Sequence, residues 1–332
     1  MVGGKITASP KAAAKPKAAA PIDAAPEPVA LRKVEGIRKV EVIANPLSGS
    51  VGPGVCEEAE ALLAAYDLEV NIQRCEAGKL SQIIASALDS KPDLVIVIAG
   101  DGTARAVAEA AGPDGPLVAP LPGGTMNMLP FAIYGQTTWP EALEAILTNG
   151  EERCISGGSV EKHSFYVAAI LGSPALWARA REAARHGKFW LAVQRARRAA
   201  QQAFTGRLRF SLDGAPRDKA EALTFMCPLV SKAVDSDASG LEAAALDPSG
   251  AVDVFRLAVA AAAGQWRADP SVNVTLVRQA YAWAGGPIPA ILDGESVRLG
   301  RTALVRFKPN AFRALVPKDT DPKEDADPKE AA

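Results

Sequence analysis

The chain has 332 residues, of which 48% are hydrophobic and 23% charged, a globular composition long enough for two modest domains. The formal net charge of -1 gives no indication of a nucleic-acid-binding protein. The sequence contains two histidines and four widely spaced cysteines without a Cys-x-x-Cys pair. Zinc catalysis and Ser-His-Asp hydrolysis are therefore poor candidates, and we expect reduced thiols in a cytoplasmic protein.

The ends of the chain carry little apolar surface. Residues 1–36 are rich in Ala, Pro and Lys, and residues 318–332 repeat Asp-Pro-Lys-Glu. We expect both to be disordered tails, the second of them acidic, because neither can bury enough apolar surface to offset its ordering entropy. The N-terminus shows no secretory hydrophobic region, and no apolar run approaches the roughly 18 residues that span a bilayer.

The first half of the chain alternates predicted strands and helices. The strands are predicted at Val40–Ala44, Leu68–Ile72, Asp93–Ala99 and Leu117–Leu121. Strands that alternate with helices predict a parallel sheet covered on both faces, and we expect a Rossmann-like α/β domain over residues 37–150. The helices are indicated by apolar residues at helical spacing, namely Val55, Ala59, Leu62 and Leu63, then Leu80, Ile83, Ile84 and Leu88.

The second half consists of short alternating segments joined by turn residues, which is typical of antiparallel sheets. We expect a β-sandwich second domain over residues 151–302, interrupted by one helical stretch from about Ala178 to Ala203. The predicted strands are Phe165–Leu171, Arg207–Leu212, Ala222–Met226, Val252–Leu257, Ala290–Leu292 and Ala303–Phe307.

Three glycine-rich elements each follow a predicted strand: Asn45-Pro-Leu-Ser-Gly49, Gly100-Asp-Gly-Thr103 and Pro122-Gly-Gly-Thr-Met-Asn127. Ligands of open parallel sheets bind beyond the carboxyl ends of the strands. Glycines let backbone amides approach an anion, the following helix offers free N–H groups, and hydroxyls can donate to phosphate oxygens. Asp101 can hold a cation that bridges those oxygens. The three elements together predict a polyphosphate site.

One such element alone would be an ordinary turn, and the prediction depends on the ordered set of three. The sequence has no Gly-x-x-x-x-Gly-Lys-[Ser/Thr], which excludes a P-loop enzyme. No Gly-x-Gly-x-x-Gly opens the first predicted helix.

The three elements together resemble the catalytic-domain signature of the diacylglycerol kinase and sphingosine kinase family. Asp293-Gly-Glu295 resembles the Asp-Gly-Glu of that family, and the segment that follows it, ending at Ala314–Pro317, also resembles the family's sequence. The resemblance covers about residues 38–317. It implies an α/β nucleotide-binding domain of the NAD kinase/diacylglycerol kinase type, then a β-sandwich, with a strand at about 303–317 returning to the first domain.

The resemblance also implies an ATP- and Mg²⁺-dependent lipid kinase, which transfers the γ-phosphoryl group to a lipid hydroxyl. Asp293 or Glu295 would act as general base, and Asp101 is a competing candidate. Asp101 and Glu295 would bind the magnesium ion. The implied ATP-binding residues are Asn45, Pro46, Ser48, Gly49, Gly100, Asp101, Gly102, Thr103, Gly124, Thr125 and Asn127.

Several positions depart from the family's pattern. Ala99 stands where a leading Gly is usual, and Ala104-Arg105-Ala106 replaces the Leu-Asn-Glu of many bacterial members, so we expect a polar contact to be lost there. Gly172–Trp177 lacks the acid of the family's substrate motif. Asp247–Gly250 replaces its Asp-Asp-Gly turn, which puts an accessory magnesium site in doubt. These departures bear on the identity of the lipid substrate more than on that of the nucleotide.

A basic stretch between Arg179 and Arg209 is interleaved with aromatic residues. Such a helix can lie on an anionic membrane surface, although it can equally be a solvated helix packed on the sandwich. We expect a lipid substrate met at a membrane surface, no nucleic-acid partner, and peripheral contact of the cytoplasmic protein with the inner face of the membrane through residues 179–209.

Two other interpretations stay open. An NAD kinase-like enzyme would share Gly100-Asp-Gly-Thr103, but Asn45-Pro-x-Ser-Gly49 and Asp293-Gly-Glu295 argue against it. A catalytically weak lipid- or nucleotide-binding pseudokinase is compatible with the altered substrate motif. Retention of the three carboxylates favours catalysis, because a binding protein gains little from buried carboxylates.

Overall fold

The computed structural model describes residues 34–175, 207–231, 239–247, 267 and 269–318. The predicted tails, the basic stretch and the strand predicted at Val252–Leu257 lie wholly or almost wholly outside these residues. In the part of the chain that is described, no helix is both long enough and apolar enough to cross a membrane.

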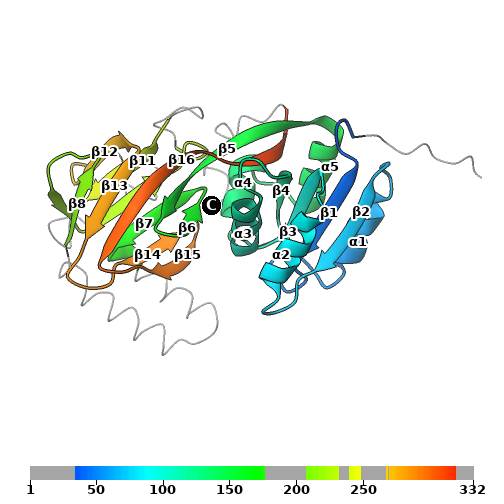
Figure 1. Cartoon of the computed structure of the whole chain (residues 1–332), viewed down its shortest axis with the longest axis horizontal. Helices are drawn as coiled ribbons and strands as arrows, with labels where there is room; N and C mark the ends of the chain where they lie inside the picture. Colours follow the sequence, from blue (N-terminus) through cyan, green and yellow to red (C-terminus); the bar gives the residue numbers. More distant parts are fainter. Residues whose placement is uncertain (1–33, 176–206, 232–238, 248–266, 268, 319–332) are drawn as a thin grey trace, which may run out of the picture. The chain divides into compact units, whose positions relative to one another are not determined.

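The first half contains the predicted parallel sheet (Figure 1). Its strands β1 (Lys39–Ala44), β2 (Glu69–Arg74), β3 (Leu94–Ala99) and β4 (Leu117–Pro122) are ordered β2-β1-β3-β4. All six residues of β3 are buried, which explains its continuous apolar run: the sheet is covered on both faces. Because β2, β1, β3 and β4 pair in parallel, the carboxyl ends of all these strands lie at the same edge of the sheet.

Five helices connect and cover these strands: α1 (Val55–Leu63), α2 (Leu80–Asp89), α3 (Asp101–Ala111), α4 (Met128–Tyr134) and α5 (Trp139–Asn149). Helix α1 buries Val55, Ala59 and Leu63, as the spacing predicts, whereas Leu62 lies at the margin of this apolar face and is 39% exposed. Helix α5 begins with a capping box between Thr138 and Glu141.

Two long strands carry the sheet into the second half of the chain. Strand β16 (Thr302–Pro317) pairs in parallel with β4 at Ala314 and antiparallel with β5 (Gly150–Val160) along most of its length. Beyond β16 the same sheet continues with β13 (Gln279–Trp283), β8 (Leu208–Leu212) and β9 (Asp218–Ala220). Sequence reasoning gave no strand at β5, because its glycines and charged residues hide the alternation of apolar positions.

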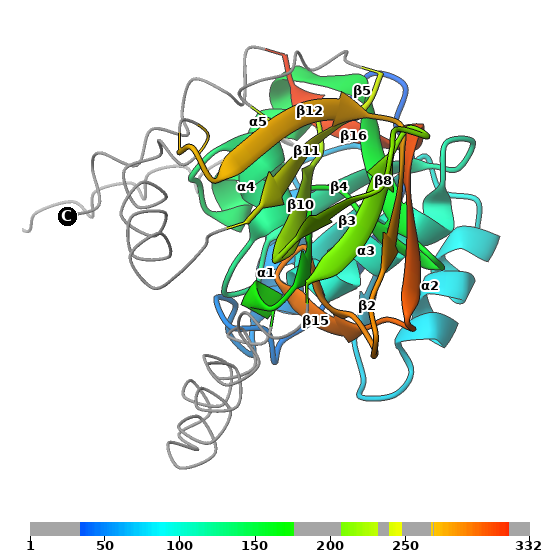
Figure 2. The same cartoon turned by 90° about the vertical axis from the view of Figure 1, so that its left-hand side faces the viewer.

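A second, antiparallel sheet packs against this part of the first one. Its order is β12-β11-β10-β7-β14-β15, and Figure 2 shows β10, β11 and β12 side by side. Large apolar side chains from both sheets form a common buried core, so the predicted fold class, an α/β domain plus a β-sandwich, is confirmed. The strands are β7 (Ala168–Gly172), β10 (Ala222–Met226), β11 (Leu241–Leu246), β12 (Val272–Val277), β14 (Pro289–Leu292) and β15 (Glu295–Arg298).

The single strand predicted at Phe165–Leu171 is in fact two strands. Strand β6 (His163–Phe165) pairs with β5 in the first sheet, whereas β7 belongs to the second. The chain changes sheets at Tyr166 and Val167, both of which are buried. Their backbone amides bind a side chain from the far end of the sequence, as described below.

Candidate active site

The first and third glycine-rich elements pack against each other beyond the carboxyl edge of the parallel sheet. Ser50 donates from its backbone N–H to the carbonyl of Gly123 (3.4 Å) and from its hydroxyl to the carbonyl of Gly124 (2.7 Å). Gly49 lies directly against the hydroxyl of Thr125. The hydroxyls of Ser50 and Thr125 thus mark where the two loops meet.

The second element meets the third at a point where only glycine fits. A Cβ atom at position 124 would lie 2.7 Å from the Cα of Gly100 and 3.6 Å from the backbone nitrogen of Asp101. Ser48 brings its hydroxyl oxygen to 3.4 Å from where a Cβ of Gly100 would be. All three elements therefore converge on the beginning of helix α3, as the sequence predicts.

Three of the predicted ATP-binding residues shape the loops with their own side chains. The side-chain oxygen of Asn45 accepts the backbone N–H of Leu47 (3.1 Å), and Pro46 is buried. Asn127 is 5% exposed, has a φ of 49°, and accepts the backbone N–H of Gly124 (2.6 Å). These contacts fix the turns, so that backbone amides rather than these side chains face the edge of the sheet.

Helix α3 begins at Asp101, with Gly100 as N-cap and Gly102 and Thr103 completing the first turn. The carboxylate of Asp101 accepts the backbone N–H of Leu129 at the start of α4 (3.1 Å). Burial raises the pKa of Asp101, backbone hydrogen bonds oppose this, and the charge of Glu295 raises the pKa further. A helix N-terminus beside glycine-rich loops provides free N–H groups and a positive dipole end for an anion.

Glu295 reaches this helix from the second half of the chain. It is the first residue of β15, its side chain is 47% exposed, and its carboxylate lies directly over Gly102. Any side chain at position 102 would overlap with that carboxylate. The glycine in the second element thus has a second purpose: it leaves room for Glu295 at the start of α3.

Asp293 has a different environment from Glu295. It is 2% exposed, and its two carboxylate oxygens accept the backbone N–H groups of Tyr166 (2.8 Å), Val167 (2.9 Å) and Ala168 (3.0 Å). Its own N–H donates to the carbonyl of Ala168 (2.9 Å). Burial raises the pKa of Asp293 to about 6, although the three amides and Arg105 oppose the shift. The side chain ties the β14–β15 hairpin to the β6–β7 connection.

Arg105 makes the contacts that join the two halves at this point. The side chain is 17% exposed, donates to the carbonyl of Leu292 (3.1 Å), and forms an ion pair with Glu295. The sequence led us to expect a lost polar contact at Arg105; the structure instead shows two new ones. The signal in the sequence was an arginine one helical turn after Asp101, on the same face of α3.

Asp101 and Glu295 fit the requirements of a magnesium site. They lie close enough for the charge of Glu295 to raise the pKa of Asp101, and a cation between them would relieve this repulsion. Mg²⁺ is usually bound through one or two carboxylates together with phosphate oxygens. Within the described residues no cluster of three or more His, Cys, Asp or Glu side chains offers an all-protein metal site.

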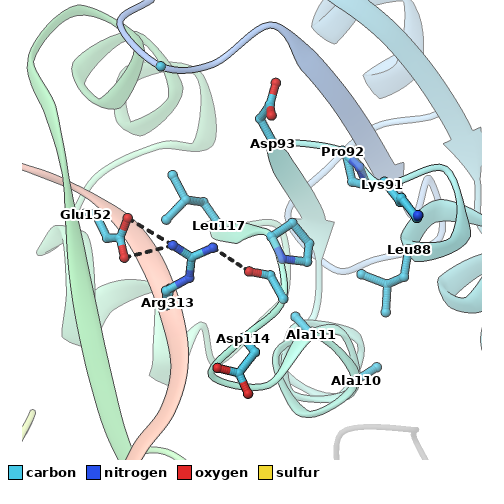
Figure 3. A pocket seen from close by; sticks show the side chains of 13 residues that line it. Leu88, Lys91, Pro92, Asp93, Ala110, Ala111, Asp114, Leu117, Glu152 and Arg313 are labelled. Carbon is cyan, nitrogen blue, oxygen red and sulfur yellow. Dashed lines mark hydrogen bonds and ion pairs between the residues drawn. The ribbon is translucent and has the colours of Figure 1, made fainter.

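A separate cavity of about 570 Å³ lies near the opposite edge of the parallel sheet (Figure 3). Its most polar wall is Arg313, whose guanidinium is bound by the carboxylate of Glu152 (3.0 and 3.1 Å) and by the carbonyl of Gly115 (2.6 Å). The carboxylate of Asp93 accepts two backbone N–H groups at the start of β1. Because no glycine-rich element reaches this cavity, and most of the polar atoms of Arg313 and Asp93 are already bound, we assign the active site to the glycine-rich edge.

Comparisons with known proteins agree with this geometry. The family model described as the diacylglycerol kinase catalytic domain matches residues 39–160. The structure of a diacylglycerol kinase from Bacillus anthracis str. Sterne aligns with a TM-score of 0.61 and 16% identity, over 85% of this chain and 97% of that one. A candidate diacylglycerol kinase from the same organism aligns at 0.64 and 19%, over 85% and 98%. No curated protein sequence matches the chain. These structural likenesses establish the fold.

The buried carboxyl of Asp293 makes stability depend on pH. Because its pKa of about 6 exceeds the ordinary value of 3.8, the folded state holds this proton more tightly than the unfolded state. That stabilisation is complete below the unfolded pKa and is lost as the pH rises through about 6. As the pH rises from below 3.8 to above 6, the free energy of unfolding of the wild type should fall by about 3 kcal/mol relative to that of Asp293→Asn. Urea denaturation of both proteins measures this difference.

Asn is the suitable replacement because it also tolerates the φ of 46° at this position. A difference between the two proteins that stays constant, or that grows as the pH is raised, would contradict the assignment.

Proposed function

We propose, from the premise that residues 39–160 form a diacylglycerol kinase catalytic domain, that this kinase transfers the γ-phosphoryl group of ATP to a hydroxyl group of a lipid. Diacylglycerol, a sphingoid base or a related glycerolipid would be the acceptor. The observation that carries the proposal is the position of Glu295: a half-exposed carboxylate lies over Gly102 where three glycine-rich loops converge.

The loops supply what phosphoryl transfer requires of a protein, namely positioning and charge stabilisation. Gly49, Gly100 and Gly124 let the three loops pack closely against one another, and the first turn of α3 beside them offers N–H groups to the phosphates. The hydroxyls of Ser48 and Thr125 lie at the same edge and can donate to phosphate oxygens.

Glu295 is the proposed general base. As the lipid oxygen attacks the γ-phosphorus, Glu295 accepts the hydroxyl proton, and the bond between the γ-phosphorus and the oxygen of ADP breaks. Asp293 is the weaker candidate, because both of its oxygens accept backbone N–H groups and it is almost fully buried. We assign to Asp293 the task of holding the hairpin that presents Glu295.

Asp101 would hold the magnesium ion, which supplies neutralising charge for the phosphoryl oxygens when bound, while Glu295 beside it accepts the proton. The acceptor would be met at a membrane surface by a protein of the cytoplasm. Contact through residues 179–209 stays a prediction of the sequence, since most of that stretch lies outside the described residues.

A kinase assay with radiolabelled ATP, magnesium and a total lipid extract tests the proposal. The wild type should label a lipid, and Glu295→Gln should lower kcat by roughly 10²- to 10⁴-fold because the proton acceptor is lost. The control variant is Glu69→Gln. It removes an exposed carboxylate on β2, far from Glu295 in the sequence, and should leave the rate unchanged.

The same assay distinguishes the alternatives. Labelling of NAD instead of lipid would indicate an NAD kinase-like enzyme. ATP binding without any labelled product would indicate a pseudokinase, and either outcome would overturn the proposed reaction.

Arg105 should affect turnover through the position of Glu295. We expect Arg105→Ala to lower kcat by up to about 10²-fold with little change in the KM for ATP, because a displaced base slows the chemical step more than nucleotide binding. Arg105→Lys keeps one charged donor and should recover part of the loss. Equal effects of Ala and Lys, or a loss confined to KM, would show that Arg105 has only a structural role.

A further inference from the structure

Among the described residues, no helix or strand covers the outer face of the first sheet where that sheet forms half of the sandwich. Strands β16, β13 and β8 lie side by side there (Figure 1), and β9 pairs with the outer edge of β8. Alternate residues such as Phe210, Ala282 and Val305 are buried against the second sheet. Because side chains alternate across a strand, the residues between them point to the other side.

The strand register gathers these outward side chains into rows. Trp283 on β13 is opposite Arg209 on β8, and Arg209 is opposite Lys219 on β9. In the next row Tyr281 is opposite Ser211. Directly opposing residues on neighbouring strands have side chains in contact range, so these residues form one continuous surface.

The aromatic residues of this surface are ordered by contacts with one another. The rings of Tyr281 and Trp283 are stacked, with centroids 6.1 Å apart and planes 20° apart. The guanidinium of Arg217, from the loop between β8 and β9, lies 5.3 Å from the centroid of Trp283. Tyr281 is nevertheless 42% exposed, an unusual position for a large aromatic side chain.

The cations of the surface have no carboxylate partners among the described residues. We call the set Arg209, Arg217, Lys219, Tyr281, Trp283 and Arg306 the cationic–aromatic face; its four cations are all exposed. The carboxylates at its margin are already bound to backbone amides: Glu161 to Leu304, Asp213 to Arg278 and Gln279, and Asp218 to Lys219. The backbone amides hold these three carboxylates at the margin without neutralising them, so the face with its four cations keeps a small excess of positive charge, although the whole chain has a net charge of -1.

We propose that the cationic–aromatic face docks on the surface of an anionic lipid bilayer. The exposed ring of Tyr281 and the partly exposed ring of Trp283 each have an apolar body and a polar end, which suits the boundary between head groups and acyl chains. Lysine and arginine side chains beside them are attracted to the anionic head groups. The choice of a bilayer over a nucleic acid rests on the proposed function, since the phosphoryl acceptor there is a membrane lipid.

The docking surface and the active site are on separate elements. The face is formed by β8, β9, β13 and the first residues of β16, whereas Glu295 begins β15 of the second sheet. Substitutions on the face therefore leave the glycine-rich loops and Glu295 intact. Binding to a bilayer can be measured without any phosphoryl transfer, so the two proposals can fail independently.

Vesicle sedimentation tests the proposal with the full chain. The wild type should bind vesicles of phosphatidylcholine mixed with phosphatidylglycerol, and should not bind vesicles of phosphatidylcholine alone. The double variant Arg209→Glu with Lys219→Glu should bind the anionic vesicles at least about thirtyfold more weakly. The matched control is Arg38→Glu with Lys91→Glu, which reverses two exposed charges elsewhere and should bind like the wild type.

Two further measurements make each outcome decisive. Thermal denaturation of the double variant establishes that it is folded, and its turnover of a short-chain, water-soluble acceptor should equal that of the wild type. Equal vesicle binding by wild type and double variant would overturn the proposal, as would tighter binding to a single-stranded oligonucleotide than to vesicles. Vesicle binding by a wild type that phosphorylates no lipid would leave the docking face standing and overturn the kinase assignment.

Discussion

The arrangement of the site depends on one buried carboxylate. Asp293 accepts three consecutive backbone N–H groups at the point where the chain passes from one sheet to the other. Burying a charge is costly unless it is hydrogen-bonded, and these three donors offset part of that cost. The contact fixes a turn with positive φ at Asp293 and Gly294. Glu295, the next residue, is thereby directed at the first turn of α3.

The remaining constraints are steric. Glycines at positions 102 and 124 leave no side chain between the loops, so Glu295 and the third loop can both approach the start of α3. Arg105, which also lies on α3, binds the carboxylate of Glu295 and the carbonyl of Leu292. The result is a site assembled from the two halves of the chain, with the start of helix α3 at its centre and a half-exposed carboxylate beside it.

The sequence predicted those parts of the site that depend on local pattern. The parallel strands follow from continuous apolar runs such as Leu94–Ala99, and the convergence of the loops follows from the rule that parallel strands end at one edge. It carried no signal for the individual hydrogen bonds between side chains and backbone groups that are far apart in the sequence. Asp293 lies more than 120 residues after the amides that it binds, so neither its burial nor the break at Tyr166 has a local signal. The partner of Arg105 was hidden for the same reason.

Hydrogen–deuterium exchange with and without ATP and magnesium tests most directly whether the two halves form one nucleotide site. On addition of nucleotide, we expect slower exchange in residues 45–50, 100–105 and 122–127 and also in residues 293–296. Protection of all four segments together would support a single site that includes the β14–β15 hairpin. Protection of the three loops with no change at residues 293–296 would contradict the placement of Glu295 at the nucleotide, and with it the proposed base.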